Sequence, residues 1–389
     1  MGGGLPSPSR ALAACALLAL GGAGCTASGS SAPTLSGKTL RIYVSAPPSL
    51  STDPEAEDVV DAERLAFQQL KGQVTAYQLG LTVLSHDKLS DNARQAIGDA
   101  GHAIAYLGEV RPGDSADSIG ITNAQDLLQV SPTDTAVELT QSTAAVSGAP
   151  KRYYESFGTY GQTFARVVPT TKVEATALID EMRSLGVRSV YVTGDRSDYG
   201  RAIASEVRTA ASGAVTPASS AASADAVFFG GSDQGKAARA FEQALSSNPK
   251  LKLFAPSALD DDAFVARLSP AARRNLYLSA PGLLPKQLAS AAPTFVPAFR
   301  AAYHRTPSAE AILGYEAMSA VIRVIQSQRS SANDRSKVVH GFIAIQNQSS
   351  PLGTYSIDKN GDTSLGPSAF VIERVKGTKL VAFKAIHTG

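Results

Sequence analysis

The sequence has 389 residues, of which 43% are apolar and 18% charged, which suffices for one large or two medium hydrophobic cores and excludes disorder over the whole length. The 36 basic and 34 acidic side chains nearly cancel, so a broad electrostatic footprint on nucleic acid is not expected and no nucleic-acid partner is predicted. Both cysteines, Cys15 and Cys25, lie near the N-terminus, which excludes a disulfide or a cysteine-based metal site further along the chain.

The first residues of the chain are typical of an export signal. Arg10 precedes an apolar run at 11–20, which is too short to span a bilayer but fits the apolar core of a secretory signal peptide. We therefore expect residues 1–24 to be removed and the mature protein to be exported.

The end of that run carries a second signal. Gly22-Ala23-Gly24-Cys25 resembles a bacterial lipobox, although the family pattern prefers leucine where Gly22 stands. The resemblance implies that Cys25 becomes the first residue, carries a lipid and anchors the protein at the extracytoplasmic face of the cell membrane. Residues 25–38, rich in Ser, Thr, Gly and Ala, then form a flexible tether. The alternative is an ordinary signal peptide cut near Ala23.

Past the tether, short runs rich in β-branched and apolar residues alternate with stretches of helical periodicity. The pattern predicts strands at 39–44, 77–84, 103–107 and 127–130, with helices at 58–70 and 91–97 between them. Such alternation indicates parallel strands joined by crossover helices.

The second half of the chain repeats this pattern more clearly. Residues 175–185 have an apolar helical face, and Gly186 is expected to end that helix. The next predicted elements are strands at 187–193, 226–229 and 251–254 and a helix at 237–245. Two such runs of similar size predict an α/β fold of two Rossmann-like lobes with mainly parallel sheets, in which ligands bind beyond the carboxyl ends of the strands.

Two segments have the character of crossings between the lobes. Residues 152–163 are rich in Tyr and Gly without a helical period, and the strand at 164–168 ends at Pro169. The strand at 276–281 is the second candidate, and helices at 294–303 and 309–326 follow it. The predicted domains are therefore lobe 1 at 39–166 plus 281–335 and lobe 2 at 167–280 plus 336–389.

The tail contains a motif that looks like part of a calcium loop. Asp358, Asn360 and Asp362 alternate as the first ligands of such a loop do, but Gly361 is misplaced and the distal glutamate is missing. The Asn-Gly pair predicts a turn, and no metal site is expected.

Five segments, in order along the chain, carry a family resemblance. They are QVSPTDTAVELT at 129–140, FARVVP at 164–169, DYG at 198–200, ADAVFFGG at 224–231, and PS at 307–308 with GYEAM at 314–318. Each is weak alone. Together they resemble the type I periplasmic binding proteins, specifically the Leu/Ile/Val branch of the solute receptors of ABC transporters.

The resemblance implies a fold and a function. Three crossings join two lobes, which close over a small polar, amino-acid-like ligand, and the closed receptor delivers that ligand to an ABC permease in the membrane. A cofactor is not expected, and the receptor is expected to be a monomer. A ligand-sensing or surface-interaction lipoprotein without a transport role is the open alternative.

The resemblance also assigns candidate ligand-binding residues. Thr135 matches the family threonine whose hydroxyl and amide hold the carboxylate of the ligand, and Tyr199 matches a tyrosine that packs on the ligand from lobe 2. Ser131 and Asp134, on the first matched segment, and Ser232, just after the fourth, are further candidates. Each residue also has a purely structural interpretation that stays open: Thr135 as a helix N-cap and Tyr199 as a buried structural residue.

Two positions depart from the family pattern. Arg111, in GEVRPG at 108–113, stands where the family has a carboxylate-binding serine, and an inward-facing arginine would favour an anionic or polar ligand. Ser257 stands where the family has the acid that pairs with the ligand ammonium. Asp260 to Asp262 follow it, and we expect them to form the solvated first turn of a helix at 263–268. The ligand is therefore not expected to be a simple branched-chain amino acid.

An enzyme, such as a hydrolase, is the rival class. The sequence contains none of the common zinc, phosphate-loop, dinucleotide or serine-hydrolase motifs, and its histidines lie singly. Ser247-Asn248-Pro249-Lys250 satisfies S-x-x-K, but Pro249 disfavours the helix that would bring serine and lysine together. The Gly-rich segment 230–235 opens a helix and fits either an anion cradle or a simple strand end. Catalysis is not expected.

Overall fold

The computed structural model describes residues 1, 34–71, 73–154 and 161–386. The predicted signal peptide, Cys25, most of the tether and part of the segment 152–163 lie outside the described residues. The chain divides into the units Met1–Ser31 and Ala32–Gly389, and the second unit contains both large sheets. Among the described helices, none combines the length and apolar character needed to cross a bilayer.

The first sheet contains six strands from the N-terminal part of the chain. They are β1 (Thr39–Ser45), β2 (Gln73–Val74), β3 (Tyr77–Leu84), β4 (Ala103–Leu107), β5 (Leu128–Ser131) and β6 (Phe164–Arg166), in the order β2-β3-β1-β4-β5-β6. All neighbours pair in parallel except β2 with β3. β4 is buried along its whole length, as expected for a continuous apolar strand covered on both faces.

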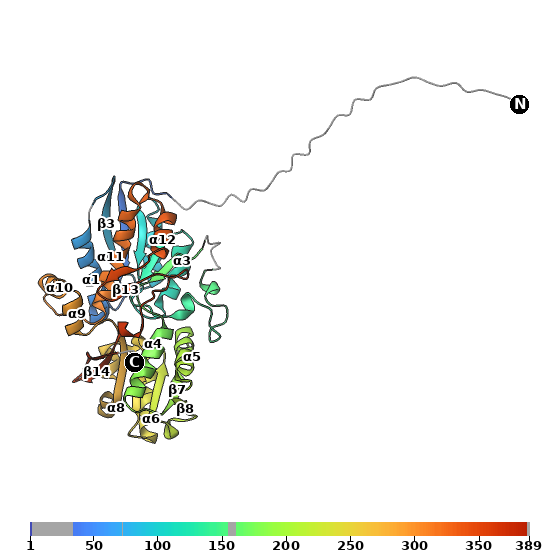
Figure 1. Cartoon of the computed structure of the whole chain (residues 1–389), viewed down its shortest axis with the longest axis vertical. Coiled ribbons are helices and arrows are strands. Elements are labelled where there is room, and N and C mark those ends of the chain that lie inside the picture. Colours follow the sequence, from blue (N-terminus) through green and yellow to red (C-terminus); the bar gives the residue numbers. More distant parts are fainter. Residues whose placement is uncertain (2–33, 72, 155–160, 387–389) are drawn as a thin grey trace. The chain divides into compact units, whose positions relative to one another are not determined.

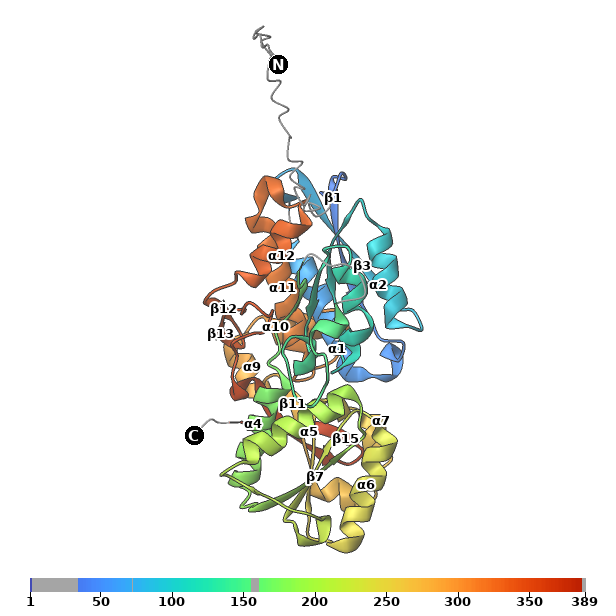
Figure 2. The same ribbon diagram turned by 90° about the vertical axis from the view of Figure 1, so that its right-hand side faces the viewer.

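Helices cover both faces of this sheet (Figures 1 and 2). They are α1 (Pro54–Leu70), α2 (Leu89–Gly98), α3 (Ile119–Asn123), α9 (Pro285–Ala291), α10 (Phe295–Tyr303), α11 (Ala311–Ser327) and α12 (Arg335–Ile343). α1 begins where the carboxylate of Asp53 accepts from Ala56 N, with Pro54 at the first helical position. α1, α11 and α12 share one core with the sheet, and α2 packs on its other face.

The second sheet contains seven strands. They are β7 (Ser189–Gly194), β8 (Thr216–Pro217), β9 (Ala226–Gly230), β10 (Lys252–Ala255), β11 (Leu276–Pro281), β14 (Phe370–Lys376) and β15 (Lys379–Ala385), in the order β15-β14-β11-β10-β9-β7-β8. β14 and β15 run antiparallel and the others are parallel. Its helices are α4 (Thr171–Ser184), α5 (Asp198–Ala211), α6 (Gln234–Ser247), α7 (Asp262–Ala266) and α8 (Pro270–Asn275).

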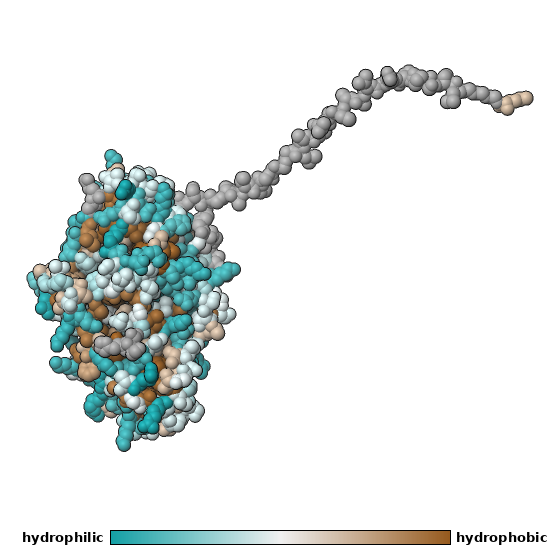
Figure 3. Space-filling view, viewed as in Figure 1, coloured by the Kyte–Doolittle hydropathy of each residue, from teal (hydrophilic) through white to brown (hydrophobic). Residues whose placement is uncertain are grey.

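The predicted α/β fold of two lobes with mainly parallel sheets is confirmed. Several expected strands match closely, among them β3, β4 and β11, because continuous apolar runs bounded by turn residues are a strong local signal. Figure 3 shows that hydrophilic and hydrophobic residues are intermixed over the drawn face of both lobes. Among the described residues, the large exposed hydrophobic side chains are Met1, Val381 and Phe383.

The structure places one boundary differently from the sequence. The predicted domains put the segment 336–369 in lobe 2, but Val338 and Phe342 of α12 are buried in the same core as Ile42 of β1. The chain therefore remains in lobe 1 through a short hairpin, β12 (Gln348–Ser350) and β13 (Gly353–Tyr355), and enters lobe 2 only before β14. The helical period of α12 predicts one buried face and does not say which of two cores receives it.

The predicted turn at 358–361 is present. Asp358 accepts from the backbone nitrogens of Asn360 and Asp362, and Gly361 has a φ of 86°. A Cβ at Gly361 would lie 2.3 Å from the carbonyl oxygen of Phe164, so glycine is required by both the backbone and the close approach to β6.

Candidate functional site

The candidate site lies where loops after strands of the two sheets meet. The loop after β4 carries Arg111 and Gly113, the segment after β5 leads to Thr135, and the loop after β10 carries Ser257 and Asp260. This is the edge at which open parallel sheets bind ligands. The structure thus brings the predicted residues of both lobes into one region.

Arg111 links the two lobes directly. Its Nε donates to Asp53 of lobe 1 at 2.9 Å, and its Nη1 donates to the backbone carbonyl of Asp260 in lobe 2 at 2.5 Å. Its guanidinium also forms an ion pair with Asp53. Because Asp53 already neutralises it, Arg111 does not present a free positive charge to an anionic ligand, in contrast to the role considered from the sequence.

A second contact joins Gly113 of lobe 1 to Tyr199, which lies in the first turn of α5. A Cβ on Gly113 would lie 3.3 Å from Cβ of Tyr199, and Gly113 has a φ of 93°. Tyr199 is buried, and its hydroxyl has no hydrogen-bond partner among the described residues. Burial raises the pKa of this hydroxyl well above its usual value. The hydroxyls of Thr135 and Ser257 lie close enough to act on this pKa as hydrogen-bond partners, so the Tyr199 hydroxyl faces polar groups of both lobes.

Thr135 does not act as a helix cap. Its hydroxyl lies 3.2 Å from Oε2 of Glu174, a fully buried residue in the first turn of α4 in lobe 2. The same carboxylate accepts from Ser257 N at 2.7 Å and from Ser279 Oγ at 2.6 Å. Burial raises the pKa of Glu174, and these donors oppose that shift. The hydroxyl that the resemblance assigned to a ligand carboxylate is therefore engaged by a carboxylate of the chain itself.

Sequence reasoning missed Glu174. It lies five residues after Pro169 and just before the predicted helical stretch at 175–185, whose period reports only that one face is buried. The signal that could have found it is a charged residue on that apolar face, because such a residue is rarely buried without donors.

Ser131 and Asp134 hold the loops of the site together. Ser131 Oγ donates to the carbonyl of Glu109 at 2.6 Å and accepts from Asp134 N at 2.8 Å. The carboxylate of Asp134 accepts from the backbone nitrogens of Gly113 and Ser115. Both predicted residues are fully buried and position the Arg111 loop against the Thr135 segment.

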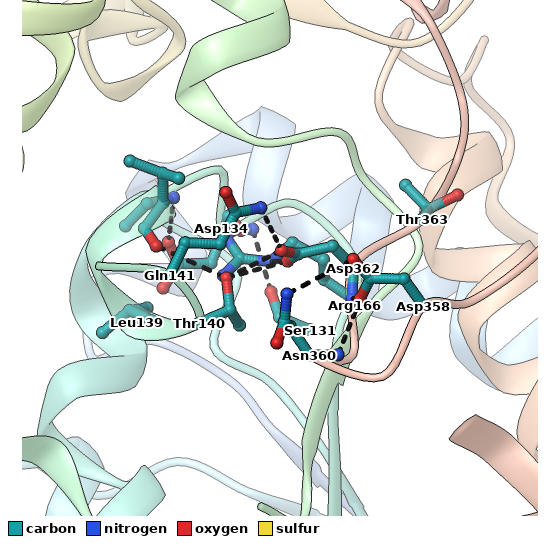
Figure 4. A network of polar contacts seen from close by, with 12 residues as sticks. Ser131, Asp134, Leu139, Thr140, Gln141, Arg166, Asp358, Asn360, Asp362 and Thr363 are labelled. Atoms are coloured by element: carbon teal, nitrogen blue, oxygen red, sulfur yellow. Dashed lines mark hydrogen bonds and ion pairs between the residues drawn. The ribbon is translucent and has the colours of Figure 1, made fainter. Parts of the chain in front are cut away.

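Figure 4 shows how this segment is fixed to the crossing between the lobes. Arg166, at the end of β6, is fully buried and donates to the carbonyl of Asp134 and the hydroxyl of Thr140. Its Nε lies 2.9 Å from the carboxylate of Asp362, which also accepts from Thr140 and Gln141. The turn at 358–361 therefore presents Asp362 to Arg166, so the motif that looked like a calcium loop has a structural use.

Ser257 and Ser232 lie in different surroundings. Ser257 is buried, and its Oγ has no hydrogen-bond partner among the described residues. Ser232 is exposed, and its backbone nitrogen, like that of Asp233, donates to the carboxylate of Asp195. The Gly-rich segment that fitted an anion cradle thus already holds a carboxylate of the chain.

A small cavity of about 170 Å³ opens beside Tyr199. Gly113 and Ser232 line it, as do Asp114 and Glu138 of lobe 1. Burial raises the pKa of Asp114 to about 8 and that of Glu138 to about 7, and neighbouring carboxylates add to both shifts. The charged side chains that line this cavity, Asp114, Glu138 and Asp198, are all acidic.

Asp260 differs from the expected solvated helix turn. Asp261 caps α7 and Asp262 is its first residue, but Asp260 is 1% exposed and faces the interior of the interface between the lobes. Burial raises the pKa of Asp260 well above its usual value, and the nearby carboxylates of Glu373, Glu310 and Glu55 raise it further.

The S-x-x-K motif has no catalytic arrangement. Ser247 ends α6, and its hydroxyl donates to the carbonyl of Gln243 at 3.3 Å. Among the described residues, no group of three or more His, Cys, Asp or Glu side chains is arranged to hold a metal ion.

Comparison with known proteins shows the fold. No protein-family model matches the sequence, and no curated protein matches it. A leucine-binding protein from Thermotoga maritima superposes with a TM-score of 0.69 and 19% identity, covering 89% of this chain and 98% of its own. An ABC transporter substrate-binding protein from Desulfitobacterium hafniense, in complex with leucine, superposes with a TM-score of 0.68 and 18% identity, covering 89% of this chain and 100% of its own. A branched-chain amino acid transporter substrate-binding protein from Streptococcus pneumoniae, in complex with isoleucine, superposes with a TM-score of 0.67 and 15% identity, covering 90% of this chain and 99% of its own.

These structures are binding proteins with the two-lobe fold that the family resemblance predicted. The chain shares this fold over nearly its whole described length. At such low identity the likeness fixes the fold and not the ligand.

Proposed function

We propose that this protein is an extracytoplasmic solute receptor that closes its two lobes on a small polar ligand and delivers it to an ABC permease. The observation that carries the proposal is the meeting of strand-end loops from two parallel sheets, with Arg111 contacting Asp260 and Gly113 contacting Tyr199 across it. The fold shared with receptors for leucine and isoleucine supports the same function.

Closure is the working step of such a receptor. A ligand that contacts both lobes binds the closed state more tightly than the open one, and this difference in affinity shifts the population toward closure. The segments around Arg166 and Pro281 connect the lobes, so small backbone rotations there open the site without disturbing either core. The permease then distinguishes closed from open receptor by the relative placement of its two lobes.

The ligand is not a simple branched-chain amino acid. Thr135, the expected carboxylate holder, is engaged by Glu174, and Ser257 stands where an acid would pair with the ligand ammonium. A free amino acid would have to displace a buried carboxylate from three donors, which costs several kcal/mol, on the order of the penalty for burying an unpaired charge.

The compartment and the anchor belong to the same proposal. Export by a signal peptide at 1–24 and lipidation of Cys25 would hold the receptor at the outer face of the membrane beside its permease. We also propose that the mature protein is a monomer without catalytic activity.

A thermal-shift panel tests the receptor function. Amino acids, amides, short acids, amines, sugars and purines are added to the purified protein, and a ligand at a hundred times its Kd should stabilise it by about 2.7 kcal/mol. Crosslinking in cells to a permease subunit tests delivery. Ligand binding without any permease contact would favour a sensor, and no shift with any class would contradict a receptor.

A further inference from the structure

The strongest unassigned feature is a cavity of about 410 Å³ at the interface between the lobes, separate from the small cavity beside Tyr199. It lies between α9 and α10 on one side and β14 and β15 on the other, and four carboxylates line it. These are Glu55 of α1, Glu310 before α11, Asp260 after β10 and Glu373 of β14. Two belong to each lobe.

The carboxylates have too few cationic partners among the described residues. The positive charge of Arg111 lowers the pKa of Glu55, Asp260 and Glu310, but Arg111 is already paired with Asp53. Arg300 also lines the cavity, but it is exposed and its Nε and Nη2 donate to Thr306. Asp260, Glu310 and Glu373 are buried and Glu55 is half-buried, and because cationic compensation is scarce their ionised forms are disfavoured.

Individual acceptor atoms are also left without donors. Oδ1 of Asp260, a residue that is 1% exposed, has no hydrogen-bond donor among the described residues, and neither has Oε2 of Glu55. The hydroxyl of Ser308, which also lines the cavity, is without a partner in the described part of the chain.

The rest of the wall is apolar. Leu283, Pro285, Leu288 and Val296 line the lobe 1 side, and Leu380 and Ala382 line the lobe 2 side. The carboxylates are not arranged to hold a metal ion among the described residues. The cavity therefore combines buried acceptors with an apolar wall, and that combination suits an organic cation with N–H donors and an apolar body.

We propose that this cavity binds an organic cation, an ammonium, amidinium or guanidinium group carried on a small apolar body, whose charge is shared by Asp260 and Glu373 of lobe 2 and Glu55 and Glu310 of lobe 1. The inference rests on the proposed receptor function and names the class of its ligand. The cation bridges acids of both lobes, so binding favours closure.

Groups that could hold an anionic ligand already hold carboxylates of the chain, which supports a preference for a cationic ligand. Glu174 engages Thr135, Asp195 engages the Gly-rich segment, and Asp53 engages Arg111, so the obvious donors for an anionic ligand are already taken.

The bound cation replaces a proton. The charged groups around the cavity are Asp53, Glu55, Arg111, Asp260, Asp262, Arg300, Glu310 and Glu373. Burial raises the pKa of Glu55 and of Glu373 to about 7, so in the free protein these carboxyls are partly protonated at neutral pH. A cation favours their ionised form, so binding should release protons to the buffer and tighten as the pH rises from 6 to 8.

Calorimetry with matched small molecules tests the proposal. Benzylamine and agmatine are titrated into the purified protein, with benzyl alcohol and benzoate as the neutral and anionic counterparts of benzylamine. We expect at least one amine to bind at least tenfold more tightly than either counterpart. We also expect heats that change with the ionisation enthalpy of the buffer in the direction of proton release.

Two variants locate the site. Glu55→Gln should weaken amine binding at least tenfold, whereas Glu57→Gln, two residues along the same helix and outside the cavity, should leave it unchanged. Glu310→Gln should also weaken binding, because an amide cannot ionise to pair with the cation, and a cooperative thermal transition shows that the variant folds.

The outcomes separate the two proposals. Tight amine binding that is insensitive to Glu55→Gln, or binding of benzyl alcohol or benzoate in preference to both amines, overturns the cation site while leaving a receptor function intact. Absence of amine binding at millimolar concentration also overturns it. Amine binding at this site with no decrease in the radius of gyration by small-angle scattering supports the site and counts against closure.

Discussion

The hydroxyl of Thr135 in lobe 1 lies 3.2 Å from the carboxylate of Glu174 in lobe 2, so a group expected to hold a ligand carboxylate holds one that belongs to the chain. Ser257 N and Ser279 Oγ donate to the other oxygen of the same carboxylate. This relationship links the lobes without a ligand, and it favours cations over anions and amino acids as the ligand class.

Replacing Glu174 should destabilise the protein. In Glu174→Gln an amide nitrogen faces donors that formerly met an oxygen, which leaves buried groups unpaired and should cost about 1–3 kcal/mol. Urea denaturation measures the loss. Asp180→Asn, at a half-buried position of the same helix in a loose pair with Arg183, should change stability by less than about 0.5 kcal/mol. Equal effects of the two variants would mean that Glu174 contributes no more than a surface residue.

Arg166 should be essential to the crossing between the lobes. It is fully buried and paired with Asp362, so Arg166→Met leaves that carboxylate buried and should cost about 3–5 kcal/mol. Arg183→Met, in an exposed pair 3.6 Å long, should cost well under about 1 kcal/mol. Asp362→Asn removes the partner of Arg166. In urea denaturation the double variant Arg166→Met with Asp362→Asn should therefore lose less unfolding free energy than the two single variants added together. Full additivity would contradict a direct interaction.

Closure should depend on the absence of a side chain at Gly113. Gly113→Ala introduces a Cβ 3.3 Å from Cβ of Tyr199 and an alanine at a φ of 93°, so it should weaken the contact between the lobes. Gly213→Ala is a matched control, because Gly213 has a φ of 76° and no atom within 4 Å of an added Cβ. Both variants should lose about 1 kcal/mol of stability from backbone strain.

Only the Gly113 variant should also bind its ligand less tightly. A titration of each variant with the ligand found in the panel measures this difference. If the two variants bind equally, contact between Gly113 and Tyr199 is not part of the ligand-bound state.

Stability should fall as the pH rises from 5 to 8. Glu109 is fully buried and accepts from Ser45 and Tyr106, and burial raises its pKa from 4.5 to about 7. The folded state therefore holds a proton that the unfolded state has lost, so the stabilisation is fully present below pH 4.5 and is lost as the pH rises through about 7. One such group contributes a slope of about 1.4 kcal/mol per pH unit.

The pH dependence can be assigned by substitution. Glu109→Gln should reduce the slope of unfolding free energy against pH, whereas Asp91→Asn, in an exposed pair with Arg94, should not. Chemical denaturation at several pH values measures both slopes. An unchanged slope in Glu109→Gln would place the raised pKa elsewhere, for example on Glu138.

Lipidation should depend on Cys25. Cys25→Ser removes the thiol that would carry the lipid, so the protein should move from the detergent phase to the aqueous phase and be released from cells. Cys15→Ser, inside the predicted signal peptide, should leave partitioning unchanged. Detergent partitioning that is the same in Cys25→Ser as in the unaltered protein would contradict the lipoprotein hypothesis.

The sequence by itself determined the order and kind of the elements. Apolar runs such as 77–84 and 103–107 became β3 and β4 with the expected bounds, because a strand buried on both faces leaves a continuous local pattern. The alternation of strands and helices determined the α/β fold, and short motifs placed Thr135 and Tyr199 near the interface between the lobes.

Only the tertiary structure decided which distant groups meet. Nothing local distinguishes Glu55, Asp260, Glu310 and Glu373, which lie far apart in the sequence, from solvated acids, yet the fold gathers them around one cavity. The same holds for α12, whose apolar face fits either core, and for Glu174, whose donors come from three other segments. Periodicity reports that a face is buried, whereas the partner of a buried charge is set by long-range packing, and that packing determines the chemistry of this site.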